Sequence, residues 1–185
     1  MVCRAIRAIL IAAALVAGAV LPGCGGGDKP ESELPRAPES VRVTSPAFDE
    51  GQTIPKRFTC DGEEISPPLA FRDVPPRARE LALVVEDPDA DRFVHWTVLR
   101  IPPDTAMISE GDVPSGSIET ENSFGDRGWG GPCPPEGDEP HRYVFALYAL
   151  SRPIGLDEDA SPDEVRSAIG DAAIARGRLT AKYGR

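Results

Sequence analysis

The 185-residue chain is poor in basic residues and in histidine. Lysine and arginine number 20 against 30 acidic residues, and the formal net charge is −10. An acidic chain repels a phosphate backbone, which excludes nucleic acid as a general partner, and its charge favours solubility. His95 and His141 are the only histidines. Imidazole chemistry is therefore confined to two positions.

A membrane-spanning apolar run is also missing near the N-terminus. Ala8 to Val20 is uncharged but has only 13 residues, and a transmembrane helix needs roughly 20. It follows two arginines and ends shortly before Cys24, which is typical of a bacterial lipoprotein signal. We predict that residues 1–23 are a signal peptide and that lipidated Cys24 anchors an extracytoplasmic protein to a membrane of the cell envelope. A plain signal peptide is the alternative.

Residues 24–40 contain few apolar side chains and much glycine, proline and charge. A segment of this composition buries too little surface to fold alone, so we predict a flexible linker. The remaining residues, 41–185, suffice for one domain with a hydrophobic core.

Cysteine is scarce as well. Two of the four cysteines, Cys3 and Cys24, lie in the predicted leader and at the predicted lipid site. Cys60 and Cys133 remain, an even pair in an oxidising compartment. We predict that they form a disulfide, which would stiffen the loop around Cys133; two unpaired buried thiols are the alternative. Neither has a neighbouring ligand at zinc-finger spacing, so we expect no metal there.

The sequence of the domain predicts short strands separated by turns. The 20 prolines and 18 glycines of the chain are typical of such an architecture. Leu81–Glu86 is apolar except at its end, so both of its faces should be covered. The density of strands and turns predicts a β-sandwich. The expected strands are residues 41–45, 57–60, 69–72, 81–86, 94–101, 117–119 and 142–150.

One helix is expected near the C-terminus. Ser161 is a typical N-cap residue, followed by proline and, three positions on, by Glu164. An apolar stripe that includes Val165 and Ile169 follows, and Gly177 predicts the end of the helix. Residues 178–183 should form a last strand or a short helix.

Polar side chains gather where the predicted strands begin and end. Asp87 follows Leu83 and Val85 at a period of two, so it should point inward at the end of its strand. A buried carboxylate needs partners, and the two histidines, His95 and His141, are the candidates. Such a cluster would share a proton among its members.

A glycine- and proline-rich loop precedes His141. Gly130 and Gly131 lack side chains, so a ligand could approach their backbone, and Pro132 would stiffen the turn. Tyr143 shares the side of His141 on an extended strand. We therefore predict that an anion such as phosphate accepts hydrogen bonds from imidazole, from the Tyr143 hydroxyl and from the N–H groups of both glycines, while the upstream aspartate orients a histidine.

Several motifs occur in an order that resembles the phosphatidylethanolamine-binding protein family, and more narrowly its bacterial Raf kinase inhibitor-like branch. The resemblance covers roughly residues 43–183. Its motifs are TCDGEEISPPLAF at 59–71, DPDA at 87–90, VHW at 94–96, GWGGPCPP at 128–135 and HRYVFALYAL at 141–150.

The resemblance implies a mainly β protein, an antiparallel Greek-key β-sandwich of that family's type with one or two short C-terminal helices. It implies a small anion site lined by Asp87, His95 and His141, with Tyr143 and the glycine-proline loop beside it, and ligands such as phosphate or phospholipid head groups. Residues Asp89 to Phe93 form a shorter loop than is usual in the branch and lack a proline, so the rim of the site should differ, with Arg92 within reach of the opening.

Three functions remain open from the sequence. The favoured one is an anchored binding module for a small anion or phospholipid head group, with no cofactor. The second is a regulatory protein that inhibits a kinase or protease, with a partner in the envelope. The third is a metal-assisted hydrolase that uses Asp87, His95 and His141, for which the sequence shows no additional base.

Overall fold

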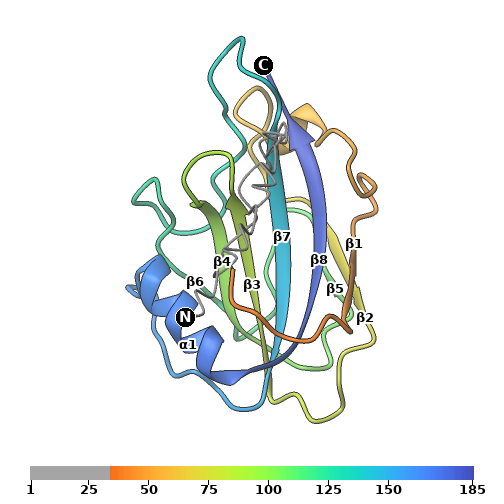
Figure 1. Ribbon diagram of the computed structural model, residues 1–185, viewed down its shortest axis with the longest axis vertical. Coiled ribbons are helices and arrows are strands. Elements are labelled where there is room, and N and C mark those ends of the chain that lie inside the picture. Colours follow the sequence, from red (N-terminus) through yellow and green to blue (C-terminus); the bar gives the residue numbers. More distant parts are fainter. Residues whose placement is uncertain (1–33) are drawn as a thin grey trace, which may run out of the picture.

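The computed structural model describes residues 34–185, which form two antiparallel sheets and one α-helix (Figure 1). The smaller sheet has the order β1-β2-β5, and the larger has the order β6-β4-β3-β7-β8. The helix α1 lies between β7 and β8 in the chain. The expectation of a mainly β protein is confirmed. The strands are β1 (Arg42–Thr44), β2 (Leu69–Arg72), β3 (Glu80–Asp87), β4 (Phe93–Ile101), β5 (Met107–Ile108), β6 (Ile118–Glu119), β7 (His141–Leu150) and β8 (Ala173–Tyr183).

Strand β3 is the centre of the larger sheet and is buried at every position. Its alternate side chains Leu81, Leu83 and Val85 face the core between the two sheets. Ala82 and Val84 belong to a second core, which the apolar face of α1 (Pro162–Ala172) covers. Coverage of both faces was predicted from the apolar run, and the structure confirms it.

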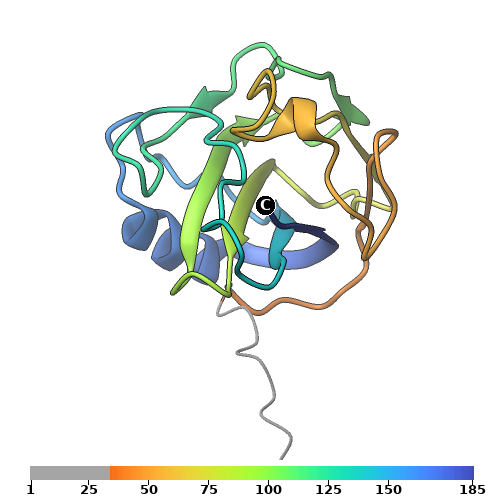
Figure 2. The ribbon, with the colours of Figure 1, turned by 90° about the horizontal axis from the view of Figure 1, so that it is seen from above.

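The antiparallel register brings three strand ends together. Strand β3 pairs with β4 on one side, where Asp87 lies opposite Phe93, and with β7 on the other. The end of β3 therefore lies beside the beginnings of β4 and β7, at the upper end of the molecule in Figure 1 and toward the viewer in Figure 2. His141, the first residue of β7, lies at this end.

One predicted strand is wrong. Residues 57–60 do not pair with a strand, and Lys56–Phe58 forms a short 3-10 helix, η1. Pro55 supplies the carbonyl that accepts from the Phe58 N–H at 3.0 Å, and both the N–H and the hydroxyl of Thr59 donate to the Lys56 carbonyl. These local bonds satisfy the backbone in a turn, which competes with a strand.

The helix begins as predicted and ends earlier than predicted. The Ser161 side chain accepts from the Glu164 N–H, and the Glu164 side chain returns to the Ser161 N–H. The last carbonyl, of Ala172, accepts from the N–H and the hydroxyl of Ser151 at 2.9 and 3.0 Å. From Ala173 onward the chain instead pairs with β7 along the whole length of that strand. Pairing in the sheet overrides the helical pattern that pointed to Gly177.

The expected linker is partly attached to the domain. Residues 34–40, which we call the strap, cross in front of β7 and β8 in Figure 1. Leu34 is only 3% exposed and packs in the second core. Arg176 donates from its main chain to the Pro38 carbonyl at 2.9 Å and from its guanidinium to the Pro35 carbonyl at 3.2 Å. The predicted signal peptide, Cys24 and the rest of the linker lie outside the described residues.

The predicted disulfide is present. Cys60 and Cys133 are bonded, with their Cα atoms 5.5 Å apart and a separation of 73 positions in the sequence. The main chain adds to this link, because the Cys60 N–H donates to the Pro132 carbonyl at 3.3 Å. The turn after η1 is thereby fixed to the glycine-proline loop.

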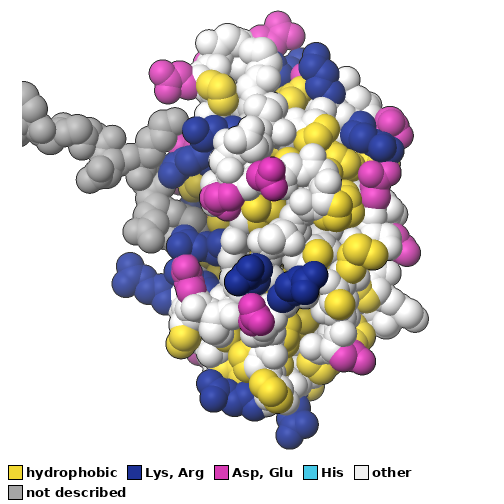
Figure 3. Space-filling view, turned by 90° about the vertical axis from the view of Figure 1, so that its right-hand side faces the viewer, with side chains coloured by type: hydrophobic (Ala, Val, Ile, Leu, Met, Phe, Trp, Pro, Cys, Tyr) yellow, Lys and Arg dark blue, Asp and Glu magenta, His cyan; other side chains and the backbone are white. Residues whose placement is uncertain are grey.

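The surface beside the smaller sheet carries basic and acidic side chains interspersed (Figure 3). Among the exposed ion pairs of the described residues, Arg57 and Glu110 lie 2.7 Å apart. Such pairs contribute little to stability individually. Within residues 34–185 no helix combines the length and hydropathy of a membrane span.

Candidate functional site

A cavity of about 210 Å³ opens at the end of the larger sheet where β3, β4 and β7 meet. Four polar side chains line it, and the remaining lining is aromatic, aliphatic, proline or disulfide. The lining residues are Asp87, Ala90, Phe93, His95, Phe124, Cys133, Pro134, Pro135, His141 and Tyr143. The structure thus brings together Asp87, His95, His141 and Tyr143, the four side chains predicted to form one site.

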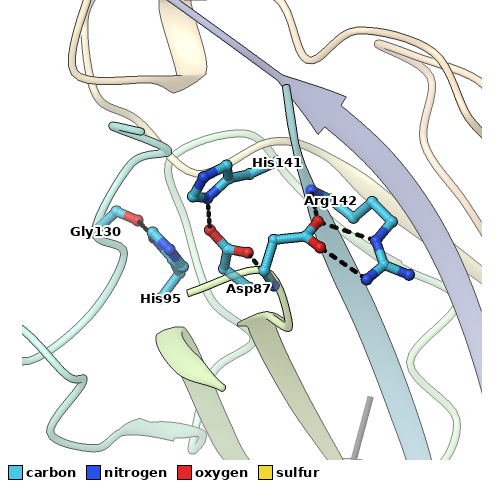
Figure 4. A network of polar contacts seen from close by, with 6 residues as sticks. Asp87, His95, Gly130, His141 and Arg142 are labelled. Carbon is cyan, nitrogen blue, oxygen red and sulfur yellow. Dashed lines mark hydrogen bonds and ion pairs between the residues drawn. The ribbon is translucent and has the colours of Figure 1, made fainter. Parts of the chain in front are cut away.

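Asp87 lies at the centre of the polar side chains of the cavity. Its carboxylate is almost fully buried and accepts from His141 Nδ1 at 2.7 Å and from the Asp89 N–H at 2.8 Å (Figure 4). The Tyr143 phenol lies close enough to feel the charge of the carboxylate. Burial, followed by the adjacent carboxylate, raises the pKa of the Tyr143 phenol well above its ordinary value. The Asp87 side chain therefore orients His141, as predicted, and lies near the Tyr143 phenol.

His95 is held by the glycine-proline loop. Its Nδ1 lies 2.8 Å from the Gly130 carbonyl oxygen, and the Gly130 N–H donates back to the His95 carbonyl at 2.9 Å. The residue is only 4% exposed. Burial lowers the pKa of His95, and the Gly130 carbonyl and the Asp87 charge oppose that effect only in part. The ring is therefore neutral near neutral pH when the cavity is empty.

Two phenylalanines complete the wall and were not predicted as site residues. The ring centroid of Phe93 lies 5.2 Å from that of His95 and 4.6 Å from that of Phe124. Phe124 is 48% exposed, so it forms part of the mouth. Phe93 stands two positions before His95 in β4, and this spacing could have identified it. Phe124 reaches the cavity only through the folded loop, which leaves no such signal in the sequence.

The backbone N–H groups that were predicted to bind the anion donate to acceptors within the protein instead. The predicted anion contact at this loop is therefore corrected. Gly130, Gly131 and Pro132 are absent from the cavity lining. The Gly130 N–H donates to the His95 carbonyl, and the Gly131 N–H donates to Glu64 Oε1 at 3.3 Å. Proline has no N–H. The two glycines serve packing instead: a Cβ at Gly131 would lie 3.0 Å from the backbone of Thr59.

An ion pair fixes the turn that carries Asp87. Asp89 accepts from the Arg142 main-chain N–H at 2.9 Å and from the guanidinium at two further points, 2.9 and 2.8 Å (Figure 4). A bidentate pair of this kind restricts both partners. The turn after β3 is thereby joined to β7 next to His141, and this junction holds Asp87 and His141 within hydrogen-bond distance.

The shorter rim loop turns sharply. Asp91 and Arg92 both have positive φ, 52° and 63°, which is uncommon for residues other than glycine. Arg92 does not line the cavity and faces a neighbouring groove that Ser161, Asp163 and Arg166 also line. The expected reach of Arg92 over the opening is therefore not seen.

Within residues 34–185, no group of three or more histidine, cysteine, aspartate or glutamate side chains is arranged to hold a metal ion. The site consists of two imidazoles, a carboxylate and aromatic rings. Such a set can bind a small charged group and surround its apolar part.

Comparison with solved structures shows the same fold. Escherichia coli YbcL, described as a member of the mammalian PEBP family, superposes with a TM-score of 0.75 at 30% identity, covering 79% of this chain and 99% of the other. A phosphatidylethanolamine-binding protein homologue from Chlamydia trachomatis gives a TM-score of 0.73 at 36% identity, with coverage of 80% and 99%.

Comparison of sequences agrees. A UPF0098 protein of Methanothermobacter thermautotrophicus is 42% identical, covering 78% of this chain and 99% of its own length. A candidate lipoprotein, LppC, of Mycobacterium tuberculosis is 37% identical, with 96% of each chain covered. The family model for phosphatidylethanolamine-binding proteins matches residues 44–184. Proteins of this family are generally binding proteins without enzymatic activity. By sequence, by fold and by the motifs that meet at its cavity, the chain belongs to the phosphatidylethanolamine-binding protein family.

Proposed function

We propose that this protein is a lipid-anchored, extracytoplasmic binding protein that holds a small anion or a phospholipid head group. The observation that carries the proposal is the arrangement of the two imidazoles. His95 and His141 line one cavity, and each is fixed through Nδ1 to a protein oxygen. The Nε2 atom of each ring has no hydrogen-bond partner within the described part of the chain.

The cavity suits a ligand with a charged end and a less polar remainder. Imidazole Nε2 atoms can contact phosphate or carboxylate oxygens, and a protonated ring adds attraction. The rings of Phe93 and Phe124 and two prolines provide apolar surface beside them. A cavity of about 210 Å³ is too small for a whole lipid, so acyl chains would remain outside.

Anchoring is proposed from the leader. The run from Ala8 to Val20 followed by Cys24 has the form of a lipoprotein signal. The relative named as a candidate lipoprotein matches nearly the whole chain. On this proposal the lipid keeps the cavity close to a membrane that contains head groups.

Calorimetry with phosphoethanolamine tests the binding function. We expect wild-type protein to bind near about pH 6.5, where imidazole is partly protonated. His141→Ala should weaken binding by about tenfold to a hundredfold, the range for loss of a charged hydrogen bond. Arg72→Ala, an exposed change in the other sheet, is the matched control and should bind as wild type does.

Two results would contradict the proposal. One is the absence of binding by folded wild-type protein at any pH from about 5.5 to 8.5, which spans the usual range of histidine titration. The other is equal binding by wild type and His141→Ala.

A further inference from the structure

The cavity offers an incoming anion few side-chain donors. Of its ten lining residues, only Asp87, His95, His141 and Tyr143 have a nitrogen or oxygen in the side chain. An ionised carboxylate only accepts hydrogen bonds. The pKa of the Tyr143 phenol is raised, so its hydroxyl can donate a hydrogen bond but stays uncharged. Among the lining side chains, only the two imidazoles can therefore bring a positive charge to the anion.

The geometry fixes which nitrogen of each imidazole carries hydrogen. His95 Nδ1 faces the Gly130 carbonyl at 2.8 Å, and His141 Nδ1 faces the Asp87 carboxylate at 2.7 Å. Both oxygens only accept, so each Nδ1 must donate. A neutral imidazole has one N–H, and its other nitrogen then carries a lone pair. In the neutral state both Nε2 atoms are acceptors, and an anion meets lone pairs.

Building on the function proposed above, we propose that this site binds its anion together with a proton, which the pair of imidazoles, His95 and His141, takes up at Nε2. The added proton converts an acceptor into a donor and gives the ring a positive charge opposite the anion. Proton uptake is then a condition of binding, and ligand affinity depends on pH.

The charges around the rings support this coupling. Strand β3 brings Asp87 to His95, and β7 brings His141 and Tyr143. The loop contributes the uncharged ring of Phe124, whose centroid lies 5.5 Å from that of the His95 ring. One carboxylate thus faces two imidazoles, which balances a single positive charge. With both rings neutral, the carboxylate leaves the empty cavity with a negative charge that opposes an incoming anion, and the proton taken up with the ligand cancels that charge.

Most of the more distant charges named here form ion pairs of their own. Asp89 and Arg142 form their own bidentate pair on the outer side of the turn. On the loop side, Arg185 pairs with Asp61 and with Glu136 at 3.3 Å each, and Glu64 Oε1 accepts from the Gly131 N–H. The net charge presented to the ligand therefore changes chiefly through the two imidazoles.

The sign of the pH effect follows from linkage. The complex holds more protons than free protein and free ligand, so raising the pH weakens binding. Where the free rings are neutral and the complex holds one added proton, affinity falls about tenfold for each pH unit by which the pH rises.

The test uses glycerophosphoethanolamine. This phosphodiester has no phosphate proton to exchange near neutrality, whereas a monoester titrates near about pH 6 and would obscure the result. Calorimetric titrations at about pH 7.5 in two phosphate-free buffers of different ionisation enthalpy give the number of protons taken up. We expect about one proton per ligand bound and about tenfold weaker binding at about pH 8.5.

Glutamine variants locate the proton. A glutamine side chain keeps an N–H donor but does not titrate in this range. We expect His95→Gln and His141→Gln each to lower the proton uptake when the rings share the proton, or only one of them to lower it when a single ring takes it. The double variant should show no uptake. Thermal unfolding of each variant checks that it is folded.

The outcomes separate this inference from the proposed function. If the wild type shows no binding across the whole pH range, both fail. Wild-type binding without proton uptake, or full uptake retained by the folded double variant, overturns proton coupling and leaves the binding function standing.

Discussion

Two adjacent glycines in the loop differ in what their missing side chains make possible. A Cβ at Gly130 would lie 2.4 Å from the ring of Phe124, and a Cβ at Gly131 would lie 3.0 Å from the backbone of Thr59. The phenylalanine is 48% exposed and can rotate away, whereas the Thr59 backbone is held by η1 and the disulfide. The same substitution should therefore have different effects at the two positions.

We expect Gly131→Ala to lower the free energy of unfolding by about 1–3 kcal/mol, the usual cost of added volume in a packed site. Gly130→Ala should change stability less and should alter ligand affinity, because it displaces a ring at the mouth of the cavity. Urea unfolding and calorimetry of both variants check this contrast. Equal loss of stability in the two variants would show that Phe124 is as fixed as the Thr59 backbone.

At the scale of single residues, the sequence predicted which side chains meet better than what each one does. Strand periodicity was enough to aim Asp87 inward, and motif order placed His95 and His141 near it. The hydrogen-bond partners could not be predicted, because they come from distant segments. Glu64 reaches the Gly131 N–H across 67 positions in the sequence. Each such partner removes a donor that local sequence suggested was free.

At the scale of elements, the strap shows where composition misleads. Residues 34–40 contain few apolar side chains, and the composition of residues 24–40 as a whole predicted a flexible linker. Attachment depends on the buried Leu34 side chain, on hydrogen bonds from the main chain and the guanidinium of Arg176, and on ion pairs of Glu39 with two arginines of β8. At Gly177 a Cβ would lie 2.2 Å from the Val41 carbonyl oxygen, so this glycine permits the close approach where the strap joins the domain.

Removal of the strap should weaken the domain. The free energy of unfolding should be about 2–4 kcal/mol lower for a protein that begins at Val41 than for one that begins at Leu34, mainly because the buried leucine is lost. Chemical unfolding of the two proteins measures the difference. Leu34→Ala in the longer protein is the control for the side chain alone and should account for most of the loss. Equal stability of the two proteins would contradict a structural role for the strap.

Elements with a strong sequence pattern were predicted well. Elements whose bounds depend on which of two hydrogen-bond arrangements the backbone adopts were not. Strand β3 and the start of α1 follow from apolar runs and from the capping residues. The end of α1 depends on Ser151, which captures the last helical carbonyl, and on the long pairing of β7 with β8. η1 depends on local hydrogen bonds at Thr59. Ser151 lies 21 positions before Ala172, so a short window of sequence does not contain the residue that ends α1, whereas the turn at η1 is local and the strand prediction overlooked it.

At the scale of the whole molecule, the proposed anchor determines where the cavity works. Cys24→Ala removes the predicted lipid site and leaves the described domain unchanged. We expect the wild type in the membrane fraction and Cys24→Ala in the soluble extracytoplasmic fraction, as seen by immunoblotting. His141→Ala is the control for folding and export and should remain with the membrane. Membrane association of Cys24→Ala equal to that of the wild type would contradict the lipid anchor.

Attachment of the strap shortens the connection to that anchor. With residues 34–40 fixed across β7 and β8, about ten residues remain between Cys24 and the domain, and their fully extended length is about 35 Å. If Cys24 carries the lipid, a domain on so short a connection would explore only a thin layer of solvent above the bilayer. Its ligand would then have to enter that layer by itself or already belong to the lipid surface beneath.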